Sequence, residues 1–403
     1  MTTTINNEHK KLNVPNLRFK EFKGEWEKTK FGDIATGFDY GMNAAAKNYD
    51  GVNKYIRITD IDEASSAYTD KDIVSPDGVL TDNYLVNNRD ILLARTGAST
   101  GKSYLYKKSD GNLYFAGFLI RANVTTHDPY FVFSQLHTHR YWRWVSIMSA
   151  RSGQPGINSQ EYSSFPIFTT SIDEENKIAK LLSLLDERIV TQNKIIEDLK
   201  KLKSAIINYA ISSLDTDFAK FSSLYEMAGE GGTPTTSNAS FYDNGKIPFI
   251  KIDDLKQKYL TENKDFITGL GLQKSSAWLV PTHSILFSNG ATIGEISITT
   301  YPVCTKQGIL GIVPKQNIDV EFLYYFMSSS YFKKAVSRIV TEGTMKTAYL
   351  KDINNILCPI PTKEKQQEIA KMPSALNSKI DFEQSILKLF CSQKQHLLRQ
   401  MFI

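Results

Sequence analysis

The feature that most constrains this chain is a long periodic stretch, residues 173–211, that contains neither proline nor glycine. Its apolar residues alternate at spacings of three and four, which is typical of a coiled-coil helix whose seam faces a second helix. Such a helix would extend about 55–60 Å, too far to be buried within one small domain. The predicted seam consists of Ile178, Leu182, Leu185, Ile189, Ile196, Leu199 and Ile206, with polar Gln192 and Lys203 at two further positions.

The same pattern returns at the end of the chain. The polar positions recur as well, because Glu383 and Lys394 occupy the places of Gln192 and Lys203. Two helices that share a seam, polar positions included, are best interpreted as partners, although two unrelated amphipathic surface helices would also show apolar stripes. The second seam consists of Ile369, Leu376, Ile380, Leu387, Phe390 and Leu397.

One residue departs from the shared pattern. Pro373 stands where the first helix has Leu182. Proline removes a backbone hydrogen bond and clashes with the preceding turn, at a cost of about 3 kcal/mol in a helix interior. We therefore expect the second helix to begin near Ser374, or to bend at residues 371–373.

The sequence before each long helix is also repeated. Residues 55–61 and 249–255 both alternate as half-buried strands, with a basic residue, Arg57 or Lys251, on the polar face. Each copy continues with a buried strand that enters a glycine-spaced loop, a further strand-like segment, a helical segment (129–150 or 319–340), a polar loop and a short strand. Each copy is therefore expected to be an α+β domain of roughly 150 residues.

Two copies in one chain usually pack about an approximate two-fold axis. We expect an α+β protein with a pseudo-two-fold internal repeat, in which two similar globular domains are separated by two long antiparallel coiled-coil helices. The predicted segments are 1–172 for the first domain, 173–212 for the central helix, 213–361 for the second domain and 362–403 for the C-terminal helix.

Composition narrows the class of protein. The apolar runs are too short for a membrane span, and residues 1–12 are too polar for a signal peptide. The three cysteines show neither metal nor disulfide spacing, which fits a reducing, cytoplasmic location. The net charge is only +5, so any affinity for nucleic acid must come from local clusters.

No catalytic or metal-binding constellation is evident. Residues 97–103 resemble a phosphate-binding P-loop, but that motif needs four residues between its glycines and this chain has three; the second copy lacks the lysine altogether. His137 and His139 would lie on different faces of a helix, which argues against a metal site. We expect neither enzymatic activity nor a cofactor in this chain.

Cations and amides recur at corresponding loops of the two copies, where they could clamp phosphates or contact base edges. Ordinary solvated loop residues are the alternative. In the helical segment 137–144 we expect the aromatic residues Tyr141, Trp142 and Trp144 in the core and the arginines outside. The predicted DNA contacts are Arg57, Thr59, Arg95, Thr96, Lys102, Arg140, Arg143, Arg151, Ser152, Gln154 and Asn158 in the first copy, and Lys251, Asn289, Lys306, Gln307, Lys333, Thr344 and Lys346 in the second.

The order and duplication of these segments resemble the specificity (S) subunits of type I restriction–modification systems. The resemblance covers essentially the whole chain. It is carried by the entry segments 14–19 and 25–34, by the strand-and-loop segments 90–97 and 284–290, and by the connectors 165–167 and 358–369.

The resemblance implies two target-recognition domains that each contact one half of a split double-stranded DNA sequence. It also implies a helical spacer that docks two methyltransferase (M) subunits, together with restriction and motor (R) subunits. S-adenosylmethionine, ATP and magnesium would then belong to those partners. The alternatives are a coiled-coil scaffold without DNA specificity and a stand-alone nucleotide-dependent enzyme that uses residues 97–103.

Overall fold

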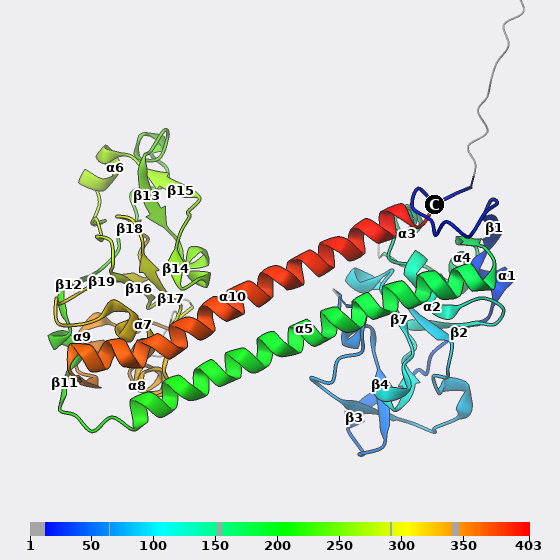
Figure 1. Cartoon of the computed structure of the whole chain (residues 1–403), viewed down its shortest axis with the longest axis horizontal. Helices are drawn as coiled ribbons and strands as arrows, with labels where there is room; N and C mark the ends of the chain where they lie inside the picture. Colours follow the sequence, from blue (N-terminus) through cyan, green and yellow to red (C-terminus); the bar gives the residue numbers. More distant parts are fainter. Residues whose placement is uncertain (1–12, 64, 151–154, 291, 341–345) are drawn as a thin grey trace, which may run out of the picture. The chain divides into compact units, whose positions relative to one another are not determined.

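The computed structural model describes residues 13–63, 65–150, 155–290, 292–340 and 346–403. The chain divides into two compact units, Met1–Asn193 with Ile386–Ile403, and Lys194–Ser385. Each unit combines a globular domain with a segment of helix α5 (Ile172–Ser212) and a segment of helix α10 (Lys363–Gln400) (Figure 1). The four-segment division expected from the sequence stays a prediction.

The first unit is built on an antiparallel four-stranded sheet in the order β2-β9-β6-β7, with a parallel pair β4–β8 and the antiparallel pairs β1–β10 and β3–β5 beside it. Its strands are β1 (Glu27–Lys30), β2 (Ala35–Tyr40), β3 (Ala45–Asn48), β4 (Asn53–Ile56), β5 (Val74–Asp77), β6 (Asp90–Ala94), β7 (Ser103–Leu105), β8 (Asn112–Phe115), β9 (Leu119–Val124) and β10 (Pro166–Thr169). Its shorter helices are α1 (Phe31–Ile34), α2 (Pro129–Gln135), α3 (His139–Ser149) and α4 (Ser159–Ser163).

The second unit repeats this topology. Its main sheet has the order β12-β19-β16-β17-β14, the parallel pair is β13–β18 with β15 at its edge, and β11 pairs with β20. The strands are β11 (Phe218–Lys220), β12 (Tyr225–Glu230), β13 (Ile247–Ile250), β14 (Tyr259–Leu260), β15 (Asp265–Ile267), β16 (Ile285–Ser288), β17 (Ile296–Thr299), β18 (Cys304–Thr305), β19 (Ile309–Pro314) and β20 (Leu357–Pro359). The helices are α6 (Gly269–Gln273), α7 (Val320–Ser328), α8 (Ser330–Ile339) and α9 (Leu350–Ile353).

The shared strand order confirms the internal repeat. In the first unit, β2, β9, β6 and β7 lie in the order in which β12, β19, β16 and β17 lie in the second. The parallel pairs β4–β8 and β13–β18 also correspond. Because both the antiparallel sheet and the parallel pair recur in the second unit, the two α+β domains are copies of one fold.

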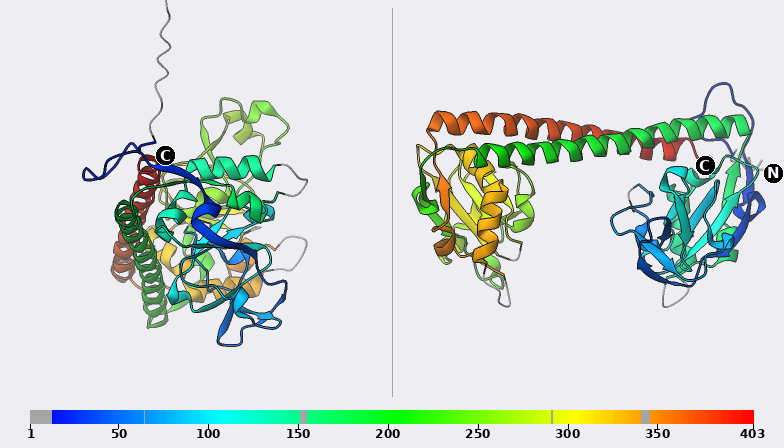
Figure 2. Two further views of the ribbon diagram at one scale, coloured as in Figure 1. Left: turned by 90° about the vertical axis from the view of Figure 1, so that its right-hand side faces the viewer. Right: turned by 90° about the horizontal axis from the view of Figure 1, so that it is seen from below.

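The predicted seams are confirmed as buried surface. Every seam position of both long helices is buried or half-buried, including the polar residues Gln192, Lys203, Glu383 and Lys394. In the first unit, Ile178 and Leu182 share a core cluster with Leu398 from the end of α10. In the second unit, the end of α5 shares a cluster with Ala370 from the start of α10. The segments of the two helices within each unit therefore run in opposite directions (Figure 2).

The expectation that the second helix begins near Ser374 is wrong, because α10 is helical from Lys363 onward and includes Pro373. Pro373 is buried at its seam position. Next to it, the Ser374 hydroxyl donates to Glu321 Oε2 at 2.7 Å and accepts from Lys258 Nζ at 3.1 Å. These tertiary contacts offset the backbone hydrogen bond that proline removes.

The helical segment 129–150 is two helices, because Thr138 accepts a hydrogen bond from Tyr141 N and so caps a new helix, α3. Ser329 caps α8 in the same way through Phe332 N. Tyr141 and Phe332 each stand three residues after the cap and are both fully buried, so they are the equivalent residues of the two copies. Trp142 was expected in the core but is 43% exposed.

Among the described helices, none is long and apolar enough to cross a membrane.

Candidate nucleic-acid interface

The first unit gathers its candidate residues where two parallel strands end. Ala116 N donates to Ile56 O at 3.0 Å, which holds the ends of β8 and β4 together. Carboxyl ends of parallel strands lie at the same edge, so the residues that follow β4 come close to those that follow β8. Arg57 and Thr59 follow β4, and Phe118 follows β8.

A cavity of about 590 Å³ opens at this edge. Three predicted residues, Arg57, Thr59 and Arg95, line it together with Tyr40 and Phe118. The two aromatic side chains, 43% and 56% exposed, were missed from the sequence. Their signal was weak, since a single exposed aromatic residue after a strand resembles ordinary surface. Cations beside exposed rings are suited to phosphates and to the faces of bases.

The two arginines of the cavity are held in fixed orientations. Arg57 donates from Nε to Asp60 Oδ2 at 2.9 Å and from Nη2 to Asp60 Oδ1 at 2.8 Å. Its Nη2 also donates to Asp72 Oδ2 at 3.1 Å. Hydrogen bonding to Asp60 raises the pKa of Arg57, so the guanidinium stays charged. Arg95 lies over the Tyr40 ring, 4.9 Å from its centroid, and its Nε donates to Gly117 O at 3.1 Å.

The loop that ends the first domain joins the same region. Thr96 pairs with Gly156, and Gly97 N donates to Pro155 O at 3.0 Å. Asn158 caps α4 by accepting from Glu161 N at 2.9 Å. Ser159 N donates to the Tyr40 hydroxyl at 3.3 Å, which links this loop to the cavity wall. Three predicted contacts, Arg151, Ser152 and Gln154, lie outside the described residues.

Three predicted residues of the first unit are placed elsewhere. Arg143 is exposed on α3. Lys102 Nζ lies 3.4 Å from Glu63 Oε2, and residues 97–99 before it form a short 3-10 turn. Arg140 donates to Pro166 O at 2.8 Å and to Gln135 Oε1 at 3.0 Å, and burial lowers its pKa to about 10. Because its guanidinium is held inside the domain, against the rings of Phe165 and Phe168, we remove Arg140 from the candidates.

The second unit has its candidates at the equivalent edge. Lys306 N donates to Ile250 O at 2.9 Å, so Lys251 and Lys306 extend from the adjacent ends of β13 and β18. Both lysines and Gln307 are exposed. Lys251 Nζ donates to Asp265 Oδ1 at 2.8 Å. Gln307 N donates to the Thr233 hydroxyl at 3.3 Å, which brings an unpredicted loop to the edge.

Asn289 is the structural equivalent of Arg95. The backbone N of each donates across the sheet edge, Arg95 to Phe118 O and Asn289 to Gly308 O, and each carbonyl accepts from the closing loop. Asn289 is only 1% exposed, and its Nδ2 donates to Ala348 O at 3.2 Å. A buried amide cannot contact a ligand at the surface, so we remove it as well. Lys333 and Lys346 are exposed, and Thr344 lies outside the described residues.

A chain with two copies of one domain, each presenting cations at the same sheet edge, defines a duplicated recognition protein. The model of the type I restriction modification DNA specificity domain matches residues 23–201 and 216–389. The chain therefore belongs to this family, which comprises specificity subunits of type I restriction–modification systems. Specificity subunits are non-catalytic components of these systems.

Relatives and solved structures agree with this assignment. The chain is 24% identical to a putative type I restriction enzyme specificity subunit, MjaX, of Methanocaldococcus jannaschii, over 93% of this chain and 92% of the relative. It is 23% identical to the MjaVIII specificity subunit of the same organism, over 91% and 90%. The fold is similar to the crystal structure of a type I S subunit from M. genitalium, with a TM-score of 0.60, 16% identity and coverage of 97% and 99%.

Proposed function

We propose that this specificity subunit contacts a bipartite DNA target, with one half-site for each globular domain, and docks the methyltransferase and restriction subunits of its complex. The observation that carries the first part is the pair of equivalent sheet edges. This edge carries Arg57, Thr59 and Arg95 in one copy and Lys251, Lys306 and Gln307 in the other, and only Arg57 and Lys251 occupy the same position in the fold. Because the side chains differ, the two half-sites should differ in sequence.

The side chains at each edge suit different parts of DNA. Lys251 and Lys306 are exposed ammonium groups that would neutralise phosphates without sequence preference. Arginine, threonine and glutamine can hydrogen-bond base edges in the major groove. Arg57 is fixed by Asp60 and so would lose little conformational entropy on binding. Phosphate contacts would set the position, and Arg57, Thr59 and Gln307 would supply specificity.

The docking of partner subunits is supported by apolar side chains outside the seams of the long helices. A partner subunit packed along these helices would remove such side chains from water, as protein interaction sites on apolar surface do. S-adenosylmethionine, ATP and magnesium would be bound by those partner subunits. The exposed residues include Leu184, Val190, Ile195, Leu202 and Tyr209 on α5, and Met372, Phe382 and Leu389 on α10.

The test is to map methylated adenines across a genome in cells that carry this chain with its methyltransferase subunit. The expected result is one motif with two short specified parts and a gap of fixed length. Combined substitution of Arg57 and Arg95 by alanine should change or abolish the requirement for one part only. Substitution of Lys251 and Gln307 should affect the other part. A single uninterrupted motif, or variants that each alter both parts, would refute the proposal.

A further inference from the structure

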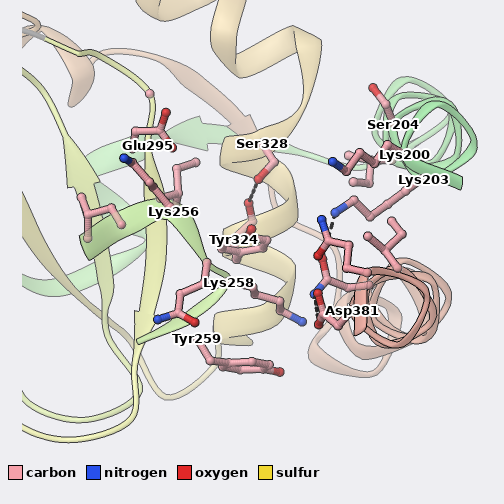
Figure 3. A pocket seen from close by; sticks show the side chains of 18 of the residues that line it. Lys200, Lys203, Ser204, Lys256, Lys258, Tyr259, Glu295, Tyr324, Ser328 and Asp381 are labelled. Carbon is pink, nitrogen blue, oxygen red and sulfur yellow. Dashed lines mark hydrogen bonds between the residues drawn. The ribbon is translucent and has the colours of Figure 1, made fainter. Parts of the chain in front are cut away.

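The second unit holds a cavity of about 640 Å³ that the proposed DNA contacts do not explain. Helices α5 and α10 form one wall, and α7, β14 and the start of β17 form the others (Figure 3). The lining is rich in cations and contains only two carboxylates, Glu295 and Asp381. The lysines that line it are Lys200, Lys203, Lys256, Lys258 and Lys333.

Two of the five lysines have carboxylate partners. Lys256 pairs with Asp253 at 3.1 Å. Lys258 pairs with Glu321 and also donates to the Tyr325 hydroxyl at 2.9 Å. For Lys200, Lys203 and Lys333, no carboxylate of the described chain lies within the 4.0 Å of an ion pair. The cavity therefore keeps excess positive charge.

Lys203 is the most buried of these three lysines, since Lys200 and Lys333 are exposed. It is half-buried at a seam position of α5, and its Nζ donates to Asn377 Oδ1 at 2.9 Å. Burial lowers the pKa of Lys203, and the neighbouring Lys258, Lys200 and Lys333 lower it further, against the opposite effect of Asp381. Burial and the neighbouring lysines therefore destabilise the charged form of Lys203, and its hydrogen-bond acceptor, the side-chain amide of Asn377, is neutral.

The first unit provides an internal comparison. Lys394 holds the same seam position as Lys203, and its Nζ lies 2.7 Å from Asp186 Oδ1. Asp186 occupies the α5 position that corresponds to Asn377 on α10 and also accepts a hydrogen bond from the Tyr130 hydroxyl. One copy of the repeat thus supplies a carboxylate to its seam lysine, whereas the other supplies an amide and opens a cavity beside it.

We infer that this cavity binds a small phosphate-bearing anion, which supplies the negative charge that Asp186 supplies in the first unit. Ammonium groups bind phosphate as point charges and need no bidentate geometry, so several lysines on different elements can converge on one phosphate. The volume lies within the range of small-molecule sites, about 300–1,000 Å³. The site is separate from the sheet edge that carries Lys251 and Lys306, so it does not rest on the proposed function.

The test is isothermal titration calorimetry of the purified full chain with inorganic phosphate and pyrophosphate, at constant ionic strength set with chloride. We expect saturable binding, tighter for pyrophosphate. Lys203→Gln should weaken it about tenfold or more, because a charged hydrogen-bond donor is lost. Asn377→Asp should have a similar effect. It places a carboxylate beside Lys203, as Asp186 stands beside Lys394 in the first unit, and that carboxylate would repel the anion.

The matched control is Lys394→Gln, which removes the equivalent lysine from the first unit and should leave phosphate affinity unchanged. Thermal melting followed by circular dichroism shows that each variant is folded. Absence of saturable phosphate or pyrophosphate binding by the unsubstituted chain overturns the inference. Binding that survives both Lys203→Gln and Asn377→Asp also overturns it, since the anion would then occupy other lysines.

Discussion

Arg57 and Asp60 form a bidentate ion pair at the end of β4, with Arg57 Nε 2.9 Å from Oδ2 and Nη2 2.8 Å from Oδ1 of the carboxylate. Asp60 Oδ2 also accepts from the Arg57 backbone N at 2.8 Å. In the second unit, Asp254 Oδ2 accepts from Lys251 N at the same distance. The repeat therefore keeps an acidic residue that shapes the turn, while the basic side chain beside it changes.

The first prediction concerns this arginine. Arg57→Ala should weaken binding of target DNA by the assembled complex by about 1–3 kcal/mol, because a fixed contact is lost. The effect should depend on the sequence of one half-site and be independent of the other. Competition binding with duplexes mutated in either half measures this. Lys47→Ala, which removes an exposed lysine that lies 3.7 Å from Asp77, serves as the control and should have little effect.

A second prediction separates phosphate contacts from base contacts. Lys306→Ala should weaken DNA binding uniformly across sequences and reduce the slope of log K against log salt by about one. Titrations at several salt concentrations measure the slope. The control is Lys201→Ala on α5, whose ammonium pairs with Glu197 at 2.6 Å within the same helix. An unchanged slope for Lys306→Ala would exclude it as a phosphate contact.

A third prediction concerns stability at the start of α5. Arg18 donates from both Nε and Nη2 to Glu174 at 2.7 Å, and Glu174 is fully buried. Arg18→Ala leaves that carboxylate without its cation and should cost about 3–5 kcal/mol. Urea unfolding followed by circular dichroism measures the loss. A loss below that of the exposed-pair variant Glu197→Ala, about 0.5 kcal/mol, would contradict the prediction.

A fourth prediction tests docking on the long helices. Leu184→Ser with Leu202→Ser removes exposed apolar side chains without touching the seam. Co-purification with the methyltransferase subunit should fall, while the melting temperature of the chain should change little. Val79→Ser is the matched control, because Val79 is 81% exposed on the first globular domain. Equal recovery of partner with the double variant and the control would refute docking at these positions.

The parts of the fold that were predictable from the sequence are those with a period or a repeat. Both seams follow from spacing alone, including the polar positions of Lys203 and Lys394, because a strict apolar period leaves few choices of face. The duplicated domain follows from matched segments. The start of the second long helix was predicted wrongly from Pro373, because the contacts of Ser374 with Glu321 and Lys258 link residues far apart in sequence.

The candidate site was predictable only in part. Arg57, Thr59 and Arg95 were predicted one by one, but the cavity that unites them depends on the pairing of β4 with β8. Asn289 and Arg140 failed as candidates because their burial is set by distant partners, Ala348 and Pro166. Sequence composition indicates that a side chain can bind a ligand, whereas exposure depends on tertiary packing.

The last prediction is a pH dependence that arises from His137. Burial, reinforced by nearby Lys394 and opposed by Asp186, lowers the pKa of His137 to about 4. Its Nδ1 lies 2.9 Å from Phe133 O and its Nε2 2.9 Å from Ser66 Oγ, so the neutral ring donates to the carbonyl and accepts from the hydroxyl. Protonation would leave Nε2 without an acceptor unless the hydroxyl turns.

Because the pKa in the unfolded chain is about 6.5, the unfolded state takes up a proton first as the pH falls. The contribution of His137 to stability is therefore complete above about pH 6.5 and is lost progressively down to about pH 4. The total loss is at most about 3.4 kcal/mol at 1.36 kcal/mol per pKa unit, and less where water reaches the ring. Urea unfolding at pH 7.5 and 5.0 should show a smaller difference for His137→Asn than for the unsubstituted chain. His139→Asn, at an exposed position on α3, should keep the full difference, and equal pH dependence in all three proteins would contradict the assignment.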